Sequence, residues 1–344
     1  MLKTFIIAFT ASLLGLAALG CMPARSAPGL GARQSASLPN QSKAQAGVTH
    51  PLPPATPASA SSPAQSQMHA TPPPPTDAEI SSRARLLISN QHHDDQAFLE
   101  YERIERQVTR SGGPDAHVAE DKTYRVVPTG MGTYKILLKT WDKPVEPAEY
   151  RRELENWAAA LQVAMNPEDP KTQSITGKFQ KKNRDRSDLV DASRTAFIPK
   201  WLQSETFHGR LCDVLELDPN PDFHPRNLTE EAMTHVMAKI WVDHASNQLA
   251  RGEAHVIRDI PVGAGILGKV YRGSSFSFEQ AEAAPGVWLP TRYEYDYSGR
   301  KFLFAFEQHQ KIDVSDYRRD GPPQHALGIV RAELDGGKAD AGDP

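Results

Sequence analysis

A glycine-rich segment carries the sharpest chemical signal in the chain. Residues 263–269 read GAGILGK, which satisfies both the GxGxxG dinucleotide pattern and the first seven positions of a phosphate-binding P-loop. However, Val270 stands where a P-loop needs Ser or Thr to bind magnesium. The residues beyond it alternate as in a strand, so no helix N-terminus follows to receive a phosphate. The segment predicts a flexible connection between strands, and no cofactor is expected.

Metal-binding patterns are incomplete. Asp218–Asp222 begins like a calcium loop, yet Phe223 takes the glycine position and Thr229 takes the position of the bidentate glutamate. The twelve His residues are dispersed without a HExxH pair, and the HHDD run at 92–95 is interpreted as a solvated helix end. We predict no metal site.

No catalytic residue stands out. The chain has no GxSxG elbow, and Cys212 lies in an apolar strand pattern that favours a small buried hydrophobe over a nucleophile. Acidic and basic residues share the first expected strand, which favours cross-strand ion pairs. They are Glu100, Glu102, Arg103, Glu105 and Arg106. We therefore predict no enzyme, and a hydrolase with an unrecognised site is the weakest of three hypotheses.

The charge balance argues against a nucleic-acid role. The 344 residues include 39 Lys and Arg against 42 Asp and Glu, a net charge of −3, which leaves no basic excess to neutralise phosphates. Only two cysteines occur, Cys21 and Cys212, and the first belongs to an export signal. No disulfide framework is therefore expected.

The N-terminus has the layout of a secretory signal. Lys3 precedes an apolar run over residues 5–19, which is too short for a comfortable membrane span. The sequence ALGC ending at Cys21 resembles the lipobox of bacterial lipoproteins, and this resemblance implies that Cys21 is diacylated. By the same resemblance, Met22 lacks the Asp that retains such proteins in the inner membrane. We expect an exported periplasmic protein, lipid-anchored at the outer membrane. An ordinary signal-peptidase site at 24–26 and an uncleaved anchor are the alternatives.

Composition divides the chain into four segments. Residues 22–77 consist mainly of Pro, Ala, Ser, Gln and Thr, with almost no apolar residue large enough to found a core, which predicts a disordered tether. A polyproline ligand for a partner domain is the alternative. The C-terminal residues are rich in Gly, Asp, Ala and Pro and are expected to fray. The expected organisation is a signal peptide at 1–21, the tether, a folded domain at 78–320 and a disordered tail at 321–344.

The folded domain interrupts strand patterns with helices. Strands are expected at 98–108, 122–127, 133–141, 202–207, 211–217, 236–242, 254–260, 274–280 and 288–297. Apolar spacings of three and four predict a helix at 147–165, a more polar helix follows at 177–196, and a short one is expected at 78–90. This order predicts a mainly β (α+β) fold, in which a curved antiparallel sheet, or incomplete β-barrel, wraps around two inserted helices near 147–166 and 178–196 that form a lid.

The segment 287–319 predicts a hairpin with one aromatic face. Ser298 and Gly299 can form a two-residue turn between two alternating runs. Counting back from that turn pairs Tyr293 with Phe304 on the aromatic face. The residues expected to line a ligand groove beneath the helices are Tyr293, Tyr295, Phe302, Phe304 and Phe306. Ordinary core packing of the same rings is the alternative.

Several short phrases resemble a known family. They are VWLPTRYEYD at 287–296, GRKFLF at 299–304, SDYR at 315–318, IWVD at 240–243 and RGEA at 251–254. They look like the C-terminal half of uncharacterised bacterial envelope proteins related to the LolA/LolB lipoprotein-carrier superfamily. The resemblance implies an incomplete β-barrel with a helical lid over a cavity for acyl chains.

Our leading hypothesis is a cell-envelope lipoprotein that binds a lipid, a lipoprotein acyl chain or another apolar ligand in a half-barrel groove. The expected partners are the membrane, through the anchor at Cys21, and an apolar ligand or lipoprotein, with no nucleic acid. The alternative is an envelope sensor or protein-interaction module on the same fold.

Overall fold

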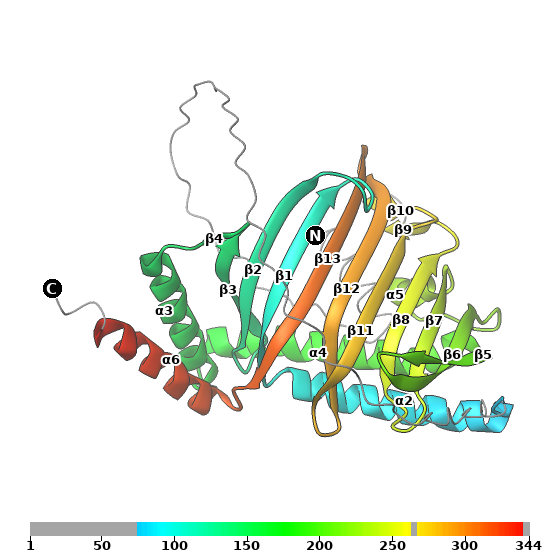
Figure 1. The fold of residues 1–344 in the computed structure, drawn as a ribbon, viewed down its shortest axis with the longest axis horizontal. Helices are drawn as coiled ribbons and strands as arrows, with labels where there is room; N and C mark the ends of the chain where they lie inside the picture. The colour runs from blue at the N-terminus through cyan, green and yellow to red at the C-terminus, as the bar shows by residue number, and fades with distance from the viewer. Residues whose placement is uncertain (1–73, 263–266, 340–344) are drawn as a thin grey trace, which may run out of the picture. The chain divides into compact units, whose positions relative to one another are not determined.

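The computed structural model describes residues 74–262 and 267–339, and Figure 1 shows their arrangement. The predicted signal peptide at 1–21 and nearly all of the predicted tether at 22–77 lie outside the described residues. Within the part of the chain that the structure describes, no helix is both long and apolar enough to cross a membrane.

The domain is built on one antiparallel sheet of thirteen strands. They are β1 (Tyr101–Ser111), β2 (Val118–Pro128), β3 (Thr133–Thr140), β4 (Lys143–Pro144), β5 (Phe197–Phe207), β6 (Arg210–Pro219), β7 (Val236–Asp243), β8 (Leu249–Val256), β9 (Ile260–Val262), β10 (Gly268–Val270), β11 (Ser275–Ala284), β12 (Val287–Lys301) and β13 (Phe304–Arg319). The main path runs β4-β3-β2-β1-β13-β12-β11-β8-β7-β6-β5, and β10 pairs with β12 and β9. The sheet is curved and stays open, which confirms the predicted fold class (Figure 1).

Helices cover both faces of the sheet. They are α2 (Asp77–Phe98), α3 (Pro147–Ala164), α4 (Pro170–Ala196), α5 (Leu228–Met233) and α6 (Pro323–Ala339). Alternation along β3 separates the two faces. Lys135 reaches Glu105, which shares a face with Arg103 and the ring of Phe98 on α2, whereas Ile136 packs with α3 and α6. The helices over the first face are therefore α2 and α4. The predicted lid is wrong in this respect, because α3 packs on the opposite face.

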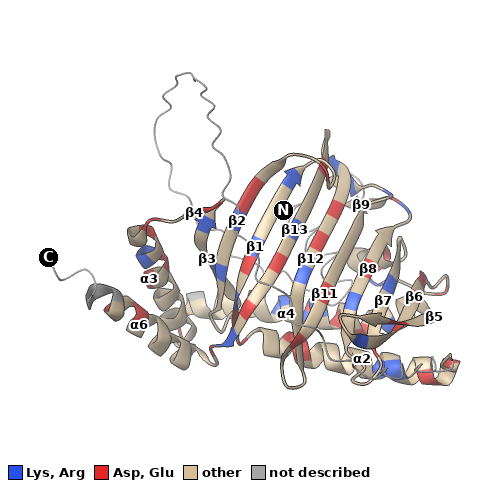
Figure 2. Ribbon diagram, in the orientation of Figure 1, with Lys and Arg blue, Asp and Glu red and all other residues tan. Residues whose placement is uncertain are grey.

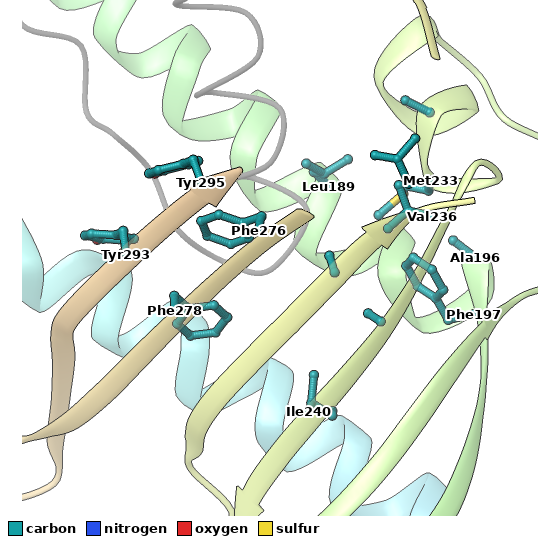
Figure 3. Packing of buried hydrophobic residues seen from close by; sticks show 14 of the residues in the cluster. Leu189, Ala196, Phe197, Met233, Val236, Ile240, Phe276, Phe278, Tyr293 and Tyr295 are labelled. Atoms are coloured by element: carbon teal, nitrogen blue, oxygen red, sulfur yellow. The ribbon is translucent and has the colours of Figure 1, made fainter. Parts of the chain in front are cut away.

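The main core lies between the sheet and α4. Phe276, Phe278 and Tyr295 are almost completely buried there, and Leu189 and Ala196 of α4 belong to the same cluster (Figure 3). The rings of Phe276 and Tyr295 lie 4.9 Å apart in a tilted arrangement, a geometry that aromatic pairs favour. The aromatic residues of β11 and β12 thus form ordinary core in this part of the sheet.

The C-terminal helix is part of the second core. Ala326, Leu327 and Val330 of α6 are buried against Trp157 and Leu161 of α3. The prediction of a disordered tail from residue 321 is therefore wrong for residues 323–339. Gly, Ala, Asp and Pro make up most of the tail, but its larger apolar residues recur at helical spacing and have a surface to cover.

The ion pairs predicted for the first strand are confirmed. Figure 2 shows acidic and basic residues on neighbouring strands. The pairs join Glu102 to Arg125 of β2 at 2.9 Å, Glu105 to Lys135 of β3 at 2.5 Å, Arg106 to Asp121 of β2 at 2.6 Å, and Glu100 to Arg319 of β13 at 2.6 Å. Since Glu105 and Arg103 are also buried, these charges are held inside the domain by one another.

The predicted hairpin register is wrong. The turn between β12 and β13 lies at Phe302 and Leu303, so Lys301 pairs with Phe304 and Tyr293 pairs with Ile312. Gly299 does not form the turn. It lies inside β12, where a Cβ atom would come within 2.4 Å of the carbonyl oxygen of Lys269 on β10. The glycine therefore allows close approach of a third strand.

Candidate functional site

An apolar cavity of about 130 Å³ lies between α2, α4 and the strands β6 to β8. Its wall is mainly aliphatic. The residues that dominate it are Ile80, Leu87 and Ile88 of α2, with Leu215, Ile240 and Leu249 of the sheet. Another side is closed by Val190 of α4 and by Phe197, the first residue of β5. Such a lining offers burial to an apolar group and few hydrogen bonds to fix its orientation.

Helix α2 is placed over this cavity by its own sequence. Thr76 and Glu79 form a capping box at its N-terminus, which satisfies backbone N–H groups that would otherwise lack partners. The apolar side chains follow at spacings of four, three and one residues, so that one face of the helix carries Ile80, Ala84, Leu87 and Ile88. The helix therefore turns an aliphatic stripe toward the sheet although most of its residues are polar.

Polar contacts attach α2 to β6 and to the loop between β7 and β8. Arg83 is paired with Asp213 of β6, and His244 lies 2.9 Å from the same carboxylate. Asn90 donates to the backbone oxygen atoms of Ser246 and Asn247 at 3.2 and 3.1 Å. Because Arg83 and Asp213 also line the cavity, this ion pair is its main charged feature.

A second, more polar cavity of about 210 Å³ adjoins the first. Gln91 lines both cavities. Its amide donates to Asp95 at 2.9 Å and accepts from Gln280 of β11 at 3.4 Å, while Arg186 of α4 holds Asp95 through two nitrogen atoms. Tyr293 lines the same space. The two cavities thus provide an aliphatic compartment beside a compartment with hydrogen-bonding groups.

Burial changes the protonation behaviour of Asp94 in the polar cavity. Its carboxylate accepts from the backbone N–H of Trp288, which lowers the pKa, and His93 contributes in the same direction. Burial outweighs both effects and raises the pKa of Asp94 to about 6. The HHDD run is therefore not a solvated helix end: it lies within α2, and Asp94 is only 2% exposed.

The structure does not bring the five predicted groove residues together. Tyr293 lines the polar cavity, Tyr295 lies in the main core, and Phe306 is half-buried against Tyr297 with ring centroids 5.7 Å apart. Phe302 and Phe304 are 52% and 79% exposed at the tip of the hairpin. None of the five lines the apolar cavity.

The residues that do line the apolar cavity escaped the sequence interpretation. A signal was present in the stripe that begins at Ile80, but the helix was expected to end at residue 90 and was not expected to cover the sheet. The facing residues Leu215, Ile240 and Leu249 come from three strands. Nothing local in the sequence indicates that they meet.

The P-loop-like segment, Cys212 and the candidate metal ligands show no catalytic or binding site among the described residues. Residues 263–266 of the P-loop-like segment lie outside the described residues. Lys269 lies in β10 and pairs with Asp259 at 3.3 Å, in agreement with a strand connection. Cys212 is fully buried, and burial raises the pKa of its thiol to about 11, so the thiol stays protonated as a small hydrophobe. Among residues 74–262 and 267–339, no group of three or more His, Cys, Asp or Glu could hold a metal ion.

No protein-family model and no curated protein matches the chain. Solved structures do. A LolA superfamily protein from Nitrosomonas europaea is 13% identical with a TM-score of 0.31, and the match covers 70% of this chain and 96% of that one. An outer membrane lipoprotein-sorting protein domain from Vibrio parahaemolyticus is 10% identical with a TM-score of 0.30, covering 72% and 99%. A DUF1329 family protein from Desulfovibrio piger is 11% identical with a TM-score of 0.27, covering 70% and 93%.

These matches confirm the predicted resemblance as a distant one. At such identities and TM-scores the likeness concerns the arrangement of strands and helices, and it says nothing of a ligand for this chain.

Proposed function

We propose that the domain binds an apolar ligand, a lipid or an acyl chain, with its apolar part in the aliphatic compartment under α2. The apolar cavity carries this proposal, because six aliphatic side chains from α2 and three strands surround a space that the packing leaves unfilled. An apolar cavity of about 150 Å³ in a protein stays dry and admits benzene. The space here is of that order.

The adjoining polar cavity supports a ligand with two ends. Gln91 lies at the boundary, and beyond it Asp95, Arg186 and Tyr293 offer donors and acceptors to a headgroup. A chain much longer than a few methylenes requires α2 to move away from the sheet. Part of what holds α2 is polar, including the ion pair of Arg83 with Asp213 and the hydrogen bonds of Asn90, and these contacts can be exchanged for water. The motion therefore costs less than opening a fully aliphatic interface would.

We further propose that the protein works in the cell envelope as a lipoprotein anchored through Cys21. The support is the lipobox-like sequence before Cys21 and the tether composition after it. Cys21→Ser should abolish incorporation of labelled palmitate and move the protein from the membrane fraction to the soluble periplasm. Unchanged fractionation without label in the parent protein would remove the anchor and leave the cavity proposal untouched.

The ligand proposal is tested by filling the cavity. Ala84 of α2 lines it and is half-buried, so the indole of Ala84→Trp can occupy the space. We expect the affinity for a fluorescent fatty acid to fall by about tenfold or more, which corresponds to about 1.4 kcal/mol. Thermal unfolding should remain cooperative, because the new ring buries apolar surface.

Ser89→Trp is the matched control, because Ser89 is exposed on the same helix and lines neither cavity. It should bind the probe as the parent does. Absence of probe binding by the parent protein, or equal binding by both variants, would contradict the ligand proposal and favour an interaction module on the same fold.

A further inference from the structure

The tip of the β12–β13 hairpin exposes an unusual run of large apolar side chains. Phe302, Leu303 and Phe304 are 52%, 86% and 79% exposed, and Leu267 beside them is 48% exposed. Single exposed hydrophobes are common, but three consecutive ones joined by a fourth form a patch that soluble domains seldom leave bare. The exposed patch at the tip therefore indicates an interaction site.

The shape of the tip limits what that partner can be. Only two residues, Phe302 and Leu303, separate the strands, and the turn projects beyond the neighbouring strand ends (Figure 1). It lies at the end of the sheet remote from α2 and α4 (Figure 1). A narrow projection of this kind has little flat surface to pack against a folded protein, and it is well shaped to enter a soft medium.

Backbone groups at the tip have hydrogen-bond partners within the domain. The N–H of Phe302 donates to the carbonyl oxygen of Leu267 at 3.1 Å, and Lys301 pairs with Phe304 across the strands. Behind the tip, Tyr297 and Phe306 pack together and fix the base of the hairpin. Because an unsatisfied N–H is costly to remove from water, these contacts lower the cost of placing the turn among acyl chains.

Basic residues lie directly behind the apolar tip. Arg300 and Lys301 are the last two residues of β12, and Figure 2 marks basic residues at this end of the strand. Lys269 of β10 lies opposite Arg300 of β12 and forms an ion pair with Asp259. The first acidic residue along β13 is Glu307, three positions behind Phe304. An apolar tip followed by cations matches the layers of an anionic lipid surface, acyl chains first and phosphates behind them.

We propose that the β12–β13 tip inserts into the surface of a membrane that contains anionic lipid, with Phe302, Leu303 and Phe304 among the acyl chains and Lys301 at the phosphate level. The contact is separate from the cavity under α2 and does not depend on the proposed ligand. It places the end of the sheet away from α2 and α4 against the lipid.

The test uses the full chain carrying Cys21→Ser, so that no acyl group at residue 21 contributes. Leu303→Trp in this background should shift its emission to the blue with phosphatidylglycerol-containing vesicles and should be quenched by brominated lipid. Leu86→Trp, at an exposed leucine of α2, is the matched control and should show neither change. Lys301→Gln should weaken vesicle binding of the Leu303→Trp protein and reduce its salt dependence.

A second comparison measures partitioning. Leu303→Gln with Phe304→Gln should lower vesicle affinity by about tenfold or more, since two apolar side chains no longer leave water. Leu86→Gln with Leu228→Gln removes two half-exposed leucines elsewhere and should change the vesicle affinity by less than about twofold. The proposal is overturned if the emission wavelength of the Leu303→Trp protein does not change when vesicles are added. A blue shift that appears with protein concentration alone also overturns it and would assign the tip to a second copy of the chain.

Discussion

The carboxylate of Asp94 accepts a hydrogen bond of 3.1 Å from the backbone N–H of Trp288, which joins α2 to the first residues of β12. Burial raises its pKa from 3.8 to about 6. The folded state therefore binds this proton more tightly than the unfolded chain does. Stability must then fall as the pH rises from about 4 to about 6, and at neutral pH the ionised group is a net cost.

Asp94→Asn should increase the free energy of unfolding at pH 7 by about 1 to 3 kcal/mol, because the amide keeps an acceptor for Trp288 and carries no charge. At pH 4 the two proteins should differ little. Urea unfolding at both pH values measures this. The matched variant Asp95→Asn should instead destabilise at pH 7, since Arg186 loses its paired carboxylate. Equal losses in both variants at pH 7 would show that ionised Asp94 is not a cost.

Local patterns predicted the elements that have one dominant apolar face. Helix α3 begins at Pro147 as expected and ends one residue earlier, because its apolar stripe and the proline at its start determine it without outside help. Strand β7 begins at Val236, also as expected, and ends one residue later. The site was not predictable in the same way, since Leu215, Ile240 and Leu249 meet only through the order of the strands.

The tail shows that composition can hide a helix. Helix α6 contains three glycines and an aspartate, yet Leu327 is buried against the second core. Leu327→Ala should therefore cost about 2 to 4 kcal/mol of unfolding free energy through lost burial and the cavity left behind. Denaturant titration measures the loss. Arg331→Ala, at an exposed position of the same helix, should stay within about 0.5 kcal/mol. A negligible loss of stability in Leu327→Ala would contradict the packing of α6 and would support the disordered tail that the composition predicts.

The hairpin shows a different reason for error. Ser298 and Gly299 match a turn signal, but the glycine is required by the approach of β10, which is distant in sequence. The real turn places Phe302 at a φ of 52°, a left-handed conformation that is uncommon for Phe and that the sequence therefore does not predict. A third strand therefore decided the register, and no local pattern contains that information.

The two registers make opposite predictions for Phe304. Since its side chain is exposed at the tip, Phe304→Ala should change the unfolding free energy by less than about 0.5 kcal/mol. Phe276→Ala, in the main core 4.9 Å from the ring of Tyr295, should cost about 3 to 5 kcal/mol. Equilibrium unfolding of both variants decides between the registers, and a large loss at Phe304 would restore the turn at Ser298 and Gly299.

Glu105 is the centre of a buried charge cluster on the first strand. One carboxylate oxygen accepts from Arg103 at 2.8 Å, and the other accepts from Lys135 at 2.5 Å. Burial alone would raise its pKa, but Lys135 and Arg103 together lower the pKa to about 2. The stability that this carboxylate contributes is therefore present above its unfolded pKa of 4.5 and is lost as the pH falls toward 2.

Glu105→Gln should cost about 3 to 5 kcal/mol at pH 7, because Arg103 is only 3% exposed and keeps its charge without a counter-ion. Between pH 4.5 and 2 the difference from the parent protein should shrink, since protonation neutralises the parent carboxylate as well. Glu120→Gln breaks an ion pair with Lys122 in which the carboxylate is half exposed to solvent, and should cost less than about 1 kcal/mol. Urea titrations across this pH range compare the three proteins.

Replacing the whole cluster separates the cost of an unpaired charge from the value of the ion pairs. In the triple variant Arg103→Met, Glu105→Leu, Lys135→Met no charge remains to be desolvated, so most of the loss seen in Glu105→Gln should be recovered at pH 7. If the triple variant is instead less stable than Glu105→Gln, the ion pairs themselves stabilise the fold. The pH dependence between 4.5 and 2 then identifies Glu105 as the group responsible, because only proteins that retain its carboxylate can show it.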